Sequence, residues 1–215
     1  LDTEIVSSAG GALSVVTKSG TNSVHGSVFG FVRSDGLRAV GELEEGTQDY
    51  GRHQLGFTLG GPITRDRTHY FLSYEHINED SITFFRPPGA YLELAEDFPV
   101  PVSSHLVLAS IDHRISAEQN VGLKLVYERF DMENFRVGGP ADESAGMQVN
   151  RENWNLVAGH DWILADNKVN SIRFQIGRKF FEEPANSDRL AEYFTFGSTL
   201  ITGANIVGDQ EMTGD

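Results

Sequence analysis

The chain of 215 residues contains no cysteine. This absence excludes a thiolate metal site, a catalytic thiol and a fold held together by disulfides. Basic residues are also scarce, because 17 lysines and arginines stand against 31 acids and leave a formal net charge of −14. Binding to a phosphate backbone requires a basic surface, so the charge balance argues against nucleic acid as a partner.

Long hydrophobic runs are missing as well. No apolar run approaches the roughly 20 residues that a membrane-spanning helix needs. This excludes helical spans but not membrane-spanning β-strands, whose hydropathy signal is weak per strand. The chain begins with Leu1 and carries no signal peptide. We therefore expect an internal fragment, for which a missing signal says nothing about location.

Alternation of apolar and polar side chains, the pattern of a strand with one apolar face, recurs along the chain. In residues 52–63, for example, Leu55, Phe57 and Leu59 share one face, and Gln54 lies on the other. The pattern is less regular in the first and fourth segments, and in the fourth Leu106 and Leu108 fall on the polar face. The predicted strands are 24–34, 52–63, 70–75, 104–114, 120–128, 153–164 and 171–180.

The connections between these segments alternate in length. Three are short and polar, at 64–67, 116–119 and 165–167. Four are long, at 35–50, 81–102, 131–148 and 182–215, and they hold 19 of the acids but only 4 of the bases. Short turns on one side and long loops on the other are typical of outer-membrane barrels. The fold class that we predict is all-β, an antiparallel meander of about seven strands forming part of a large, incomplete transmembrane β-barrel.

A soluble β-sandwich is the alternative on pattern alone, because its strands also alternate. A sandwich rarely has a long connection at every second position. Aromatic side chains also gather near the predicted strand ends, as they do at membrane interfaces. These two features favour the membrane barrel.

Two motifs resemble a known family. Residues 10–26 read GGALSVVTKSGTNSVHG, which resembles the end of the plug domain and its junction with the first barrel strand in TonB-dependent outer-membrane receptors, particularly the Oar-like group. Residues 54–63, QLGFTLGGPI, followed by RDRTHYFLSYE at 65–75, are similar to a hairpin of the same family. A weaker similarity joins DHRI at 112–115 with YERF at 127–130.

The resemblance implies that residues 1–23 are the C-terminal end of a plug domain and its junction, and that 24–215 are the N-terminal part of the barrel with long extracellular loops. A TonB box, an N-terminal carboxypeptidase-like domain and most of a plug are missing from the sequence. Glycines and Asn22 suit tight turns, and Gly26 and Gly30 would let the plug approach the wall closely. The junction residues implied are Gly10, Gly11, Thr17, Lys18, Ser19, Gly20, Thr21, Asn22 and Gly26.

The function implied by the resemblance is energised uptake of an oligosaccharide, a peptide or a siderophore-like solute across the Gram-negative outer membrane. The implied partners are outer-membrane lipid, the remainder of the barrel and plug, and a TonB-type energy-coupling protein. In the second long loop, Phe84, Phe85, Tyr91 and Phe98 can stack on a solute, although packing of loop against loop is favoured. The rival functions are a non-transporting barrel, such as an adhesin or scaffold, and a soluble β-sandwich binding module.

Enzyme chemistry finds no support in the sequence. The seven histidines lack metal-ligand spacing, and the acids Glu42, Glu44, Glu45 and Asp49 lack the spacing of a calcium loop. Neither a G-x-S-x-G motif nor a phosphate-binding loop occurs. We therefore expect no catalytic, cofactor or metal residues and no enzymatic activity.

Overall fold

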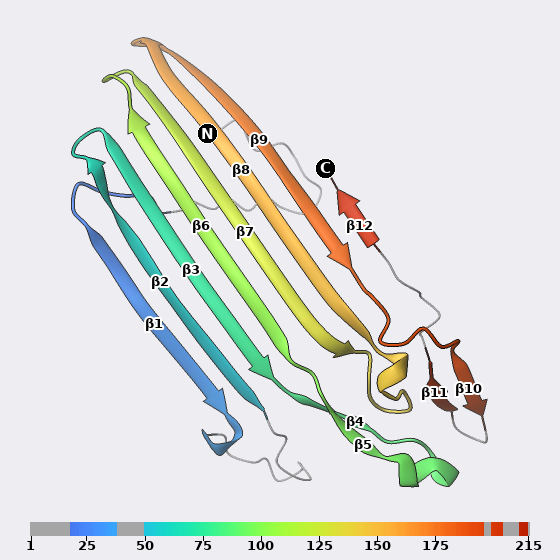
Figure 1. Cartoon of the computed structure of the whole chain (residues 1–215). Coiled ribbons are helices and arrows are strands. Elements are labelled where there is room, and N and C mark those ends of the chain that lie inside the picture. The colour runs from blue at the N-terminus through green and yellow to red at the C-terminus, as the bar shows by residue number, and fades with distance from the viewer. Residues whose placement is uncertain (1–17, 38–49, 196–198, 204–210, 215) are drawn as a thin grey trace.

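The computed structural model describes residues 18–37, 50–195, 199–203 and 211–214. Its main element is one antiparallel sheet, in which the strands follow each other across the wall largely in chain order (Figure 1). The predicted all-β meander of seven long strands is confirmed, with a short eighth strand at one edge. The strands are β1 (His25–Ser34), β2 (Gly51–Thr64), β3 (Thr68–Asp80), β6 (Val102–Arg114), β7 (Gln119–Phe135), β8 (Met147–Ala165), β9 (Lys168–Glu182) and β12 (Glu211–Gly214).

Smaller elements lie in the long connections. Two hairpins, β4–β5 and β10–β11, extend beyond the main sheet at the end opposite the three short turns (Figure 1). Three short 3-10 helices accompany them, and no helix in the described ranges is long and apolar enough to cross a membrane. The bounds are β4 (Ile82–Phe85), β5 (Glu96–Pro99), β10 (Glu192–Thr195), β11 (Thr199–Thr202), η1 (Asp35–Leu37), η2 (Gly89–Leu94) and η3 (Glu143–Ala145).

The strand registers bring the apolar positions of all the long strands onto one face. Paired residues of neighbouring strands share a face, so a chain of pairs forms a row across the sheet. One row contains Val28, Phe57, Tyr74, Val107, Tyr127 and Trp154. The next row toward the short turns contains Leu59, Leu72, Ala109, Leu125, Leu156 and Ile176.

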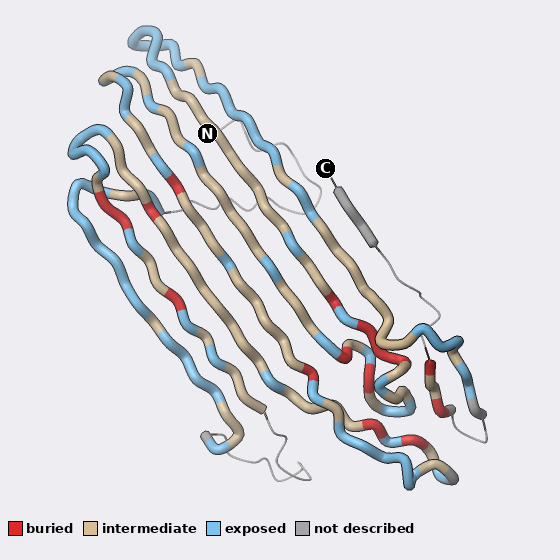
Figure 2. The backbone as a smooth tube through the Cα atoms, in the orientation of Figure 1, coloured by how far each residue is buried: buried red, intermediate tan, exposed pale blue. Residues whose placement is uncertain are grey.

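This apolar face is uncovered. Val28 is 86% exposed, Phe174 60% and Ile172 57%, and most of the sheet shows intermediate or exposed residues (Figure 2). The soluble-sandwich alternative is wrong for the described strands, because no second sheet packs against the apolar face. A continuous apolar face of this extent requires hydrocarbon rather than water as its solvent. We therefore call it the lipid face.

The opposite face is polar and carries hydrogen bonds between neighbouring strands. Gln54 Nε2 donates to Glu75 Oε1 at 2.9 Å, and Asn153 Nδ2 donates to Glu128 Oε2 at 3.1 Å. Leu106 lies on this face, as the sequence predicts, since it pairs with Glu75 and Glu128. Polar groups that bond across strands suit a water-filled interior, so we call this the lumen face.

Several strands are longer than the sequence predicts. β7 continues to Phe135 and β8 begins at Met147, so much of the predicted loop 131–148 is paired strand. Apolar alternation stops where a wall leaves the hydrocarbon layer, whereas backbone pairing can continue into water. The predicted loops 81–102 and 182–215 likewise contain hairpins.

The few buried apolar side chains lie mainly at the end of the sheet that carries the long connections. Phe71 is the exception, because it lies within β3. This distribution means that the wall itself has no core and that only the segments of the long connections pack as a soluble protein does. The other buried apolar residues are Phe85, Val100, Val137, Ala145, Met147, Val149 and Leu200.

The described sheet is open at both edges. β1 pairs with β2 alone, and most of β9 pairs only with β8, because β12 reaches just its last residues. Unpaired backbone groups cannot face lipid, so open edges do not occur in a finished membrane wall. The described strands therefore form part of a barrel that they do not close.

Candidate functional site

The junction lies at the end of the wall that carries the short turns. Residues Lys18–Val24 lead into β1, and Gly20 lies directly against the backbone of β3 on the lumen face. A Cβ atom at Gly20 would overlap the carbonyl oxygen of Tyr70 and would lie 2.8 Å from its nitrogen and 2.9 Å from His69 Cβ. Only glycine therefore allows the chain to cross the wall at this closeness.

Asn22 fastens the junction to the β2–β3 turn. Its Nδ2 donates to Asp66 Oδ1 at 2.6 Å, and its Oδ1 accepts from the Asp66 backbone N–H at 2.8 Å. The same oxygen accepts from His69 Nε2 at 2.8 Å. Asp66 has a φ of 61°, the left-handed conformation that a tight turn requires. We call this set of contacts the clasp.

The other predicted junction residues behave differently from one another. Thr21 Oγ1 donates to the Ser23 carbonyl at 3.0 Å and shapes the approach to β1. The interpretation of Gly26 is wrong, because this residue belongs to the lipid-face row and its missing Cβ makes room for the Thr58 carbonyl of β2. Gly30 likewise faces Leu55 rather than the lumen. Gly10, Gly11 and Thr17 lie outside the described residues, and assignment of 1–23 to a plug stays a prediction.

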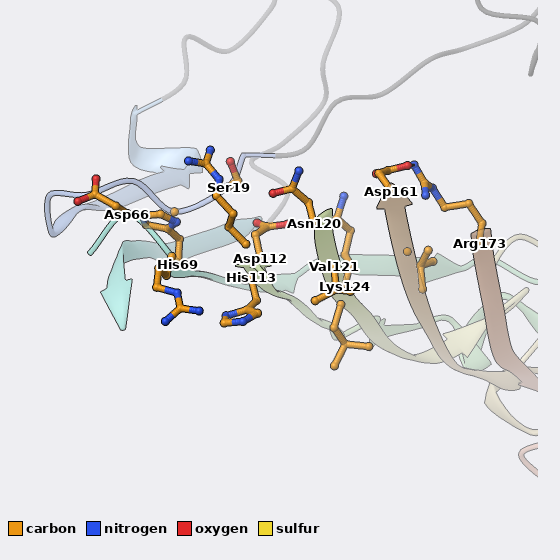
Figure 3. Close-up of a pocket in the computed structure, with 17 residues that line it drawn as sticks. Ser19, Asp66, His69, Asp112, His113, Asn120, Val121, Lys124, Asp161 and Arg173 are labelled. Atoms are coloured by element: carbon orange, nitrogen blue, oxygen red, sulfur yellow. The ribbon is translucent and has the colours of Figure 1, made fainter. Parts of the chain in front are cut away.

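A cavity of about 500 Å³ adjoins the junction on the lumen side (Figure 3). Ser19 and Gly20 form one part of its lining, and residues of the β2–β3 turn and of β3, β6, β7, β8 and β9, many of them charged, form the rest. Asp161 accepts from Arg173 at 2.8 and 3.0 Å and from Ser171 Oγ at 2.7 Å. Acids and bases are mixed in this lining, which suits contact with polar polypeptide or water. The charged residues are Asp66, Arg67, Asp112, Arg114, Lys124, Asp161 and Arg173.

At the other end of the wall, three long connections are joined by backbone hydrogen bonds. Residues 137–139 bond to β4, since Arg86 N donates to the Gly139 carbonyl at 2.8 Å and Gly139 N to the Phe84 carbonyl at 2.9 Å. On the other side, Ile201 N donates to the Pro140 carbonyl at 2.8 Å. The segment between β7 and β8 therefore links the other two long connections into one unit, which we call the cap.

The cap contains a second cavity, of about 570 Å³. Phe85, Tyr91 and Phe98 line it, and their predicted contact with a solute stays a prediction. Phe85 is only 4% exposed and its ring centroid lies 6.4 Å from that of Phe98. Phe84 does not line the cavity, and its ring lies under the Arg86 guanidinium at 5.0 Å. The buried Phe85 supports the packing interpretation for that residue.

Residues that the sequence does not single out complete this cavity. They lie between β7 and β8 and after β9, where neither periodicity nor a motif in the sequence marks them. The predicted loops 131–148 and 182–215 contain them, but no signal in the sequence identifies the particular positions. They are Asp142, Glu143, Ser144, Arg189, Glu192, Leu200 and Thr202.

Removing the Phe85 ring is expected to loosen the cap. Truncating a buried phenylalanine to alanine costs about 3–5 kcal/mol, so Phe85→Ala should speed amide exchange at Arg86 and Gly139, whose N–H groups join β4 to residues 137–139. Hydrogen exchange measured by mass spectrometry reports this directly. Phe84→Ala is the matched control, because Phe84 is only half-buried and its cation–π contact with the exposed Arg86 is worth only about 0.5–1 kcal/mol. Equal effects of the two variants would contradict the packing role of Phe85.

Metal or cofactor sites are not evident in the part of the chain that the structure describes. Within it, no group of three or more histidine, aspartate or glutamate side chains is placed to hold a metal ion. The acids Glu42, Glu44, Glu45 and Asp49 lie outside that part. The arrangement at both ends of the wall therefore offers polar and aromatic contacts for binding.

Comparison with known proteins indicates the class of domain to which the sheet belongs. Residues 16–93 match a family model described as an outer membrane beta barrel domain. A segment of 75 residues is 40% identical to the TonB-dependent transporter Oar of Myxococcus xanthus, a match that covers 31% of this chain and 7% of that transporter. The chain thus spans a small fraction of the length of this relative. No solved structure matches the chain significantly. With the fold, these matches indicate a β-barrel domain of the outer membrane of Gram-negative bacteria.

Proposed function

We propose that the chain forms part of a TonB-dependent outer-membrane receptor that takes up a solute through the barrel lumen. The observation that carries this proposal is the path of the junction, which reaches β1 across the lumen face and is fastened there by the clasp. A receptor of this kind must tie a lumenal plug to the wall at the periplasmic end. The similarity to a relative named as a TonB-dependent transporter supports the same assignment.

In this proposal the solute first meets the cap. Tyr91 and Phe98 offer ring faces, and Glu96 and Asp142 offer carboxylate oxygens in the same cavity. Rings that stack and acceptors that bond hydroxyl or amine groups suit an oligosaccharide, a peptide or a siderophore-like solute. The chain has no catalytic role in this scheme.

The clasp then has a mechanical role. A TonB-type partner would move the plug so that the solute can pass, and the tie to the wall must hold while the plug moves. Asn22 makes three hydrogen bonds to Asp66 and His69, each worth about 0.5–1.5 kcal/mol net. The clasp would keep the last plug residues in place at the periplasmic end of the wall.

Energised uptake can be tested in cells that carry the protein or lack it. The probes are fluorescein-labelled maltoheptaose, a fluorescein-labelled decapeptide and a ferric hydroxamate siderophore. We expect one of these to accumulate only in cells with the protein, and accumulation to stop when TonB is deleted or the proton gradient is collapsed. Binding at the cell surface without accumulation for every probe would favour a non-transporting adhesin or scaffold. Accumulation that persists without TonB would also contradict the proposal.

A further inference from the structure

A third cavity, of about 830 Å³, lies along the wall between the cap and the junction. Most of its lining residues belong to the lumen face of β6, β7, β8 and β9, which lie side by side (Figure 1). Its volume is within the range of small-molecule sites, about 300–1,000 Å³. Gln175 borders it and pairs with Val157, which lines the cavity beside the junction. The two cavities therefore adjoin, and we call the new one the mid-wall cavity.

The strand registers place apolar groups at one side of the mid-wall cavity and polar groups at the other. Two rows of paired residues cross it, and each begins with an apolar side chain on β6 or β7. An asparagine of β8 follows in both rows. Because neighbouring strands lie about 4.8 Å apart, a row across four strands spans roughly 14 Å. In order toward β9, the rows are Leu106, Glu128, Asn153 and Lys179, and Val126, Asn155 and Gly177.

The charges that face the lumen in the mid-wall cavity cancel. They are Glu128 and Lys179, which lie in one row with Asn153 between them. Arg178 also borders the cavity, but it belongs to the lipid-face row of Trp154. The cavity beside the junction has seven charged lining residues, and the cap cavity has four acids and one arginine. An uncharged ligand therefore suits the mid-wall cavity better than an ionic one.

Three side-chain amides supply most of the polar groups of this cavity. Asn153 Nδ2 donates to Glu128 Oε2 at 3.1 Å, which leaves Asn153 Oδ1 as an acceptor. Asn155 Oδ1 is buried and has no hydrogen-bond partner in the described part of the chain, a deficit that a ligand donor would relieve. Gln175 is exposed and makes no hydrogen bond to a described residue. An amide both donates and accepts, as a sugar hydroxyl does, so the two kinds of group match.

We propose that the mid-wall cavity binds a segment of an uncharged oligosaccharide as it passes along the lumen. A sugar ring presents C–H groups on its faces and hydroxyl groups around its edge. The C–H groups would contact Leu106 and Val126, and the hydroxyl groups would bond the amides of Asn153, Asn155 and Gln175. A peptide of mixed sequence would bring charged side chains, for which the cavity has no surplus of either sign. The inference rests on the proposed function, because a wall site in the lumen meets a solute only if the barrel takes one up.

The test uses the full-length receptor, purified from outer membranes in an uncharged detergent. The probes are an array of short, neutral glucan, mannan, galactan and xylan oligosaccharides, with an uncharged glycine–serine decapeptide for comparison. We expect at least one oligosaccharide to bind and the decapeptide not to bind. Raising the salt concentration should leave the binding unchanged, because no ion pair with the ligand can be screened.

Two variants remove the amides one at a time. Asn155→Leu and Gln175→Leu should each weaken the dissociation constant of the bound oligosaccharide about two- to tenfold, as expected for one lost hydrogen bond. Asn155→Leu should not lower the melting temperature, because it removes a buried oxygen that has no partner in the described ranges. Asn120→Leu is the matched control, since it removes an exposed amide from the lumen face of β7 outside the mid-wall cavity. We expect this control to bind as the unaltered protein does.

Three results would overturn the inference. If no neutral oligosaccharide bound, or if only the decapeptide did, the class of ligand would be wrong. If Asn155→Leu and Gln175→Leu bound the sugar as tightly as the unaltered receptor, the sugar would be held elsewhere, as in the cap. If Asn120→Leu weakened binding equally, the lumen face as a whole would be responsible rather than this cavity.

Failure of this inference can be told apart from failure of the proposed function. Binding to the purified receptor requires neither TonB nor a proton gradient, whereas accumulation in cells requires both. Accumulation of the siderophore without any oligosaccharide binding would overturn the mid-wall site and leave energised uptake standing. Oligosaccharide binding that the two amide variants weaken, without accumulation in cells, would support the site and contradict energised uptake.

Discussion

Leu125→Arg is expected to destabilise the folded wall by about 2–4 kcal/mol, the cost of an arginine near the bilayer midplane on the lipid face of a barrel. Leu125 lies in the middle of β7, with Ala109 and Leu156 beside it in its row. The guanidinium would have to lose its hydration or draw water into the hydrocarbon layer. Chemical unfolding of the protein in lipid vesicles, followed by tryptophan fluorescence, measures the loss.

The next residue along β7 provides the control. Val126 lies on the lumen face, where it pairs with Leu108 and Asn155, so Val126→Arg can extend its guanidinium into water. We expect Val126→Arg to cost far less than Leu125→Arg. A larger loss from Val126→Arg would mean that the two faces are assigned the wrong way round, and the membrane orientation of every strand would have to be reversed.

The faces of the strands could be predicted because the hydrocarbon layer constrains every second residue. Leu106 and Leu108 illustrate the strength of this constraint. Both are apolar residues at positions that the alternation assigns to the polar face, and both do lie on the lumen face. Pairing propagates the choice of face from strand to strand, so one regular segment such as 52–63 determines its neighbours. The ends of the strands could be predicted less well than their faces. β7 and β8 continue past the apolar band, where no alternation of apolar and polar residues is required.

The sites depend on contacts that sequence spacing does not encode. Asn22 and Asp66 are 44 residues apart in the sequence. They meet because the β2–β3 turn and the residues that lead into β1 lie at the same end of the sheet. Motif similarity marked Asn22 as a junction residue without indicating its partner. The error at Gly26 has the same origin, because a glycine in a motif does not reveal which face of the strand it occupies.

The cap was the least predictable part of the chain. Its cavity joins Phe85 from one loop with Ser144 and Thr202 from two others, and Ser144 Oγ lies 3.1 Å from Thr202 Oγ1. These segments fold in water, where long acidic loops can take many conformations of similar energy. Their arrangement results from backbone bonds between loops, such as Asp142 N to the Ile201 carbonyl at 3.1 Å, and no local pattern specifies such pairs.

The two ends of the wall suit different tasks. The cap is a packed unit with buried side chains, so it can present a fixed binding surface to the outside. The junction is exposed and held by a few polar contacts, with Asn22 and Asp66 both open to water. The few polar contacts of the junction can form only while the chain lies close to the sheet. Gly20 sets the distance between the junction and the backbone of β3.

Gly20→Val is therefore expected to lift the junction off the wall and to open the clasp. A valine side chain would overlap the Tyr70 carbonyl, and β3 cannot move away because Tyr70 is paired with Gly61 on one side and Ile111 on the other. Inserting side-chain atoms into such a contact costs about 1–3 kcal/mol. The junction has few bonds to resist this, so the loss should appear there rather than in the sheet.

The Asp66 amide is the reporter, because its N–H donates to Asn22 Oδ1 only while the clasp is closed. We expect its hydrogen exchange to accelerate about tenfold or more in Gly20→Val, since 1.4 kcal/mol corresponds to a factor of ten, while amides in the middle of β3 stay protected. Gly51→Val is the control, because no heavy atom lies within 4 Å of the Cβ position at Gly51. Unchanged Asp66 exchange in Gly20→Val would show that the junction does not depend on close contact with β3. If exchange accelerates and energised uptake falls with it, the clasp matters for transport as well as for structure.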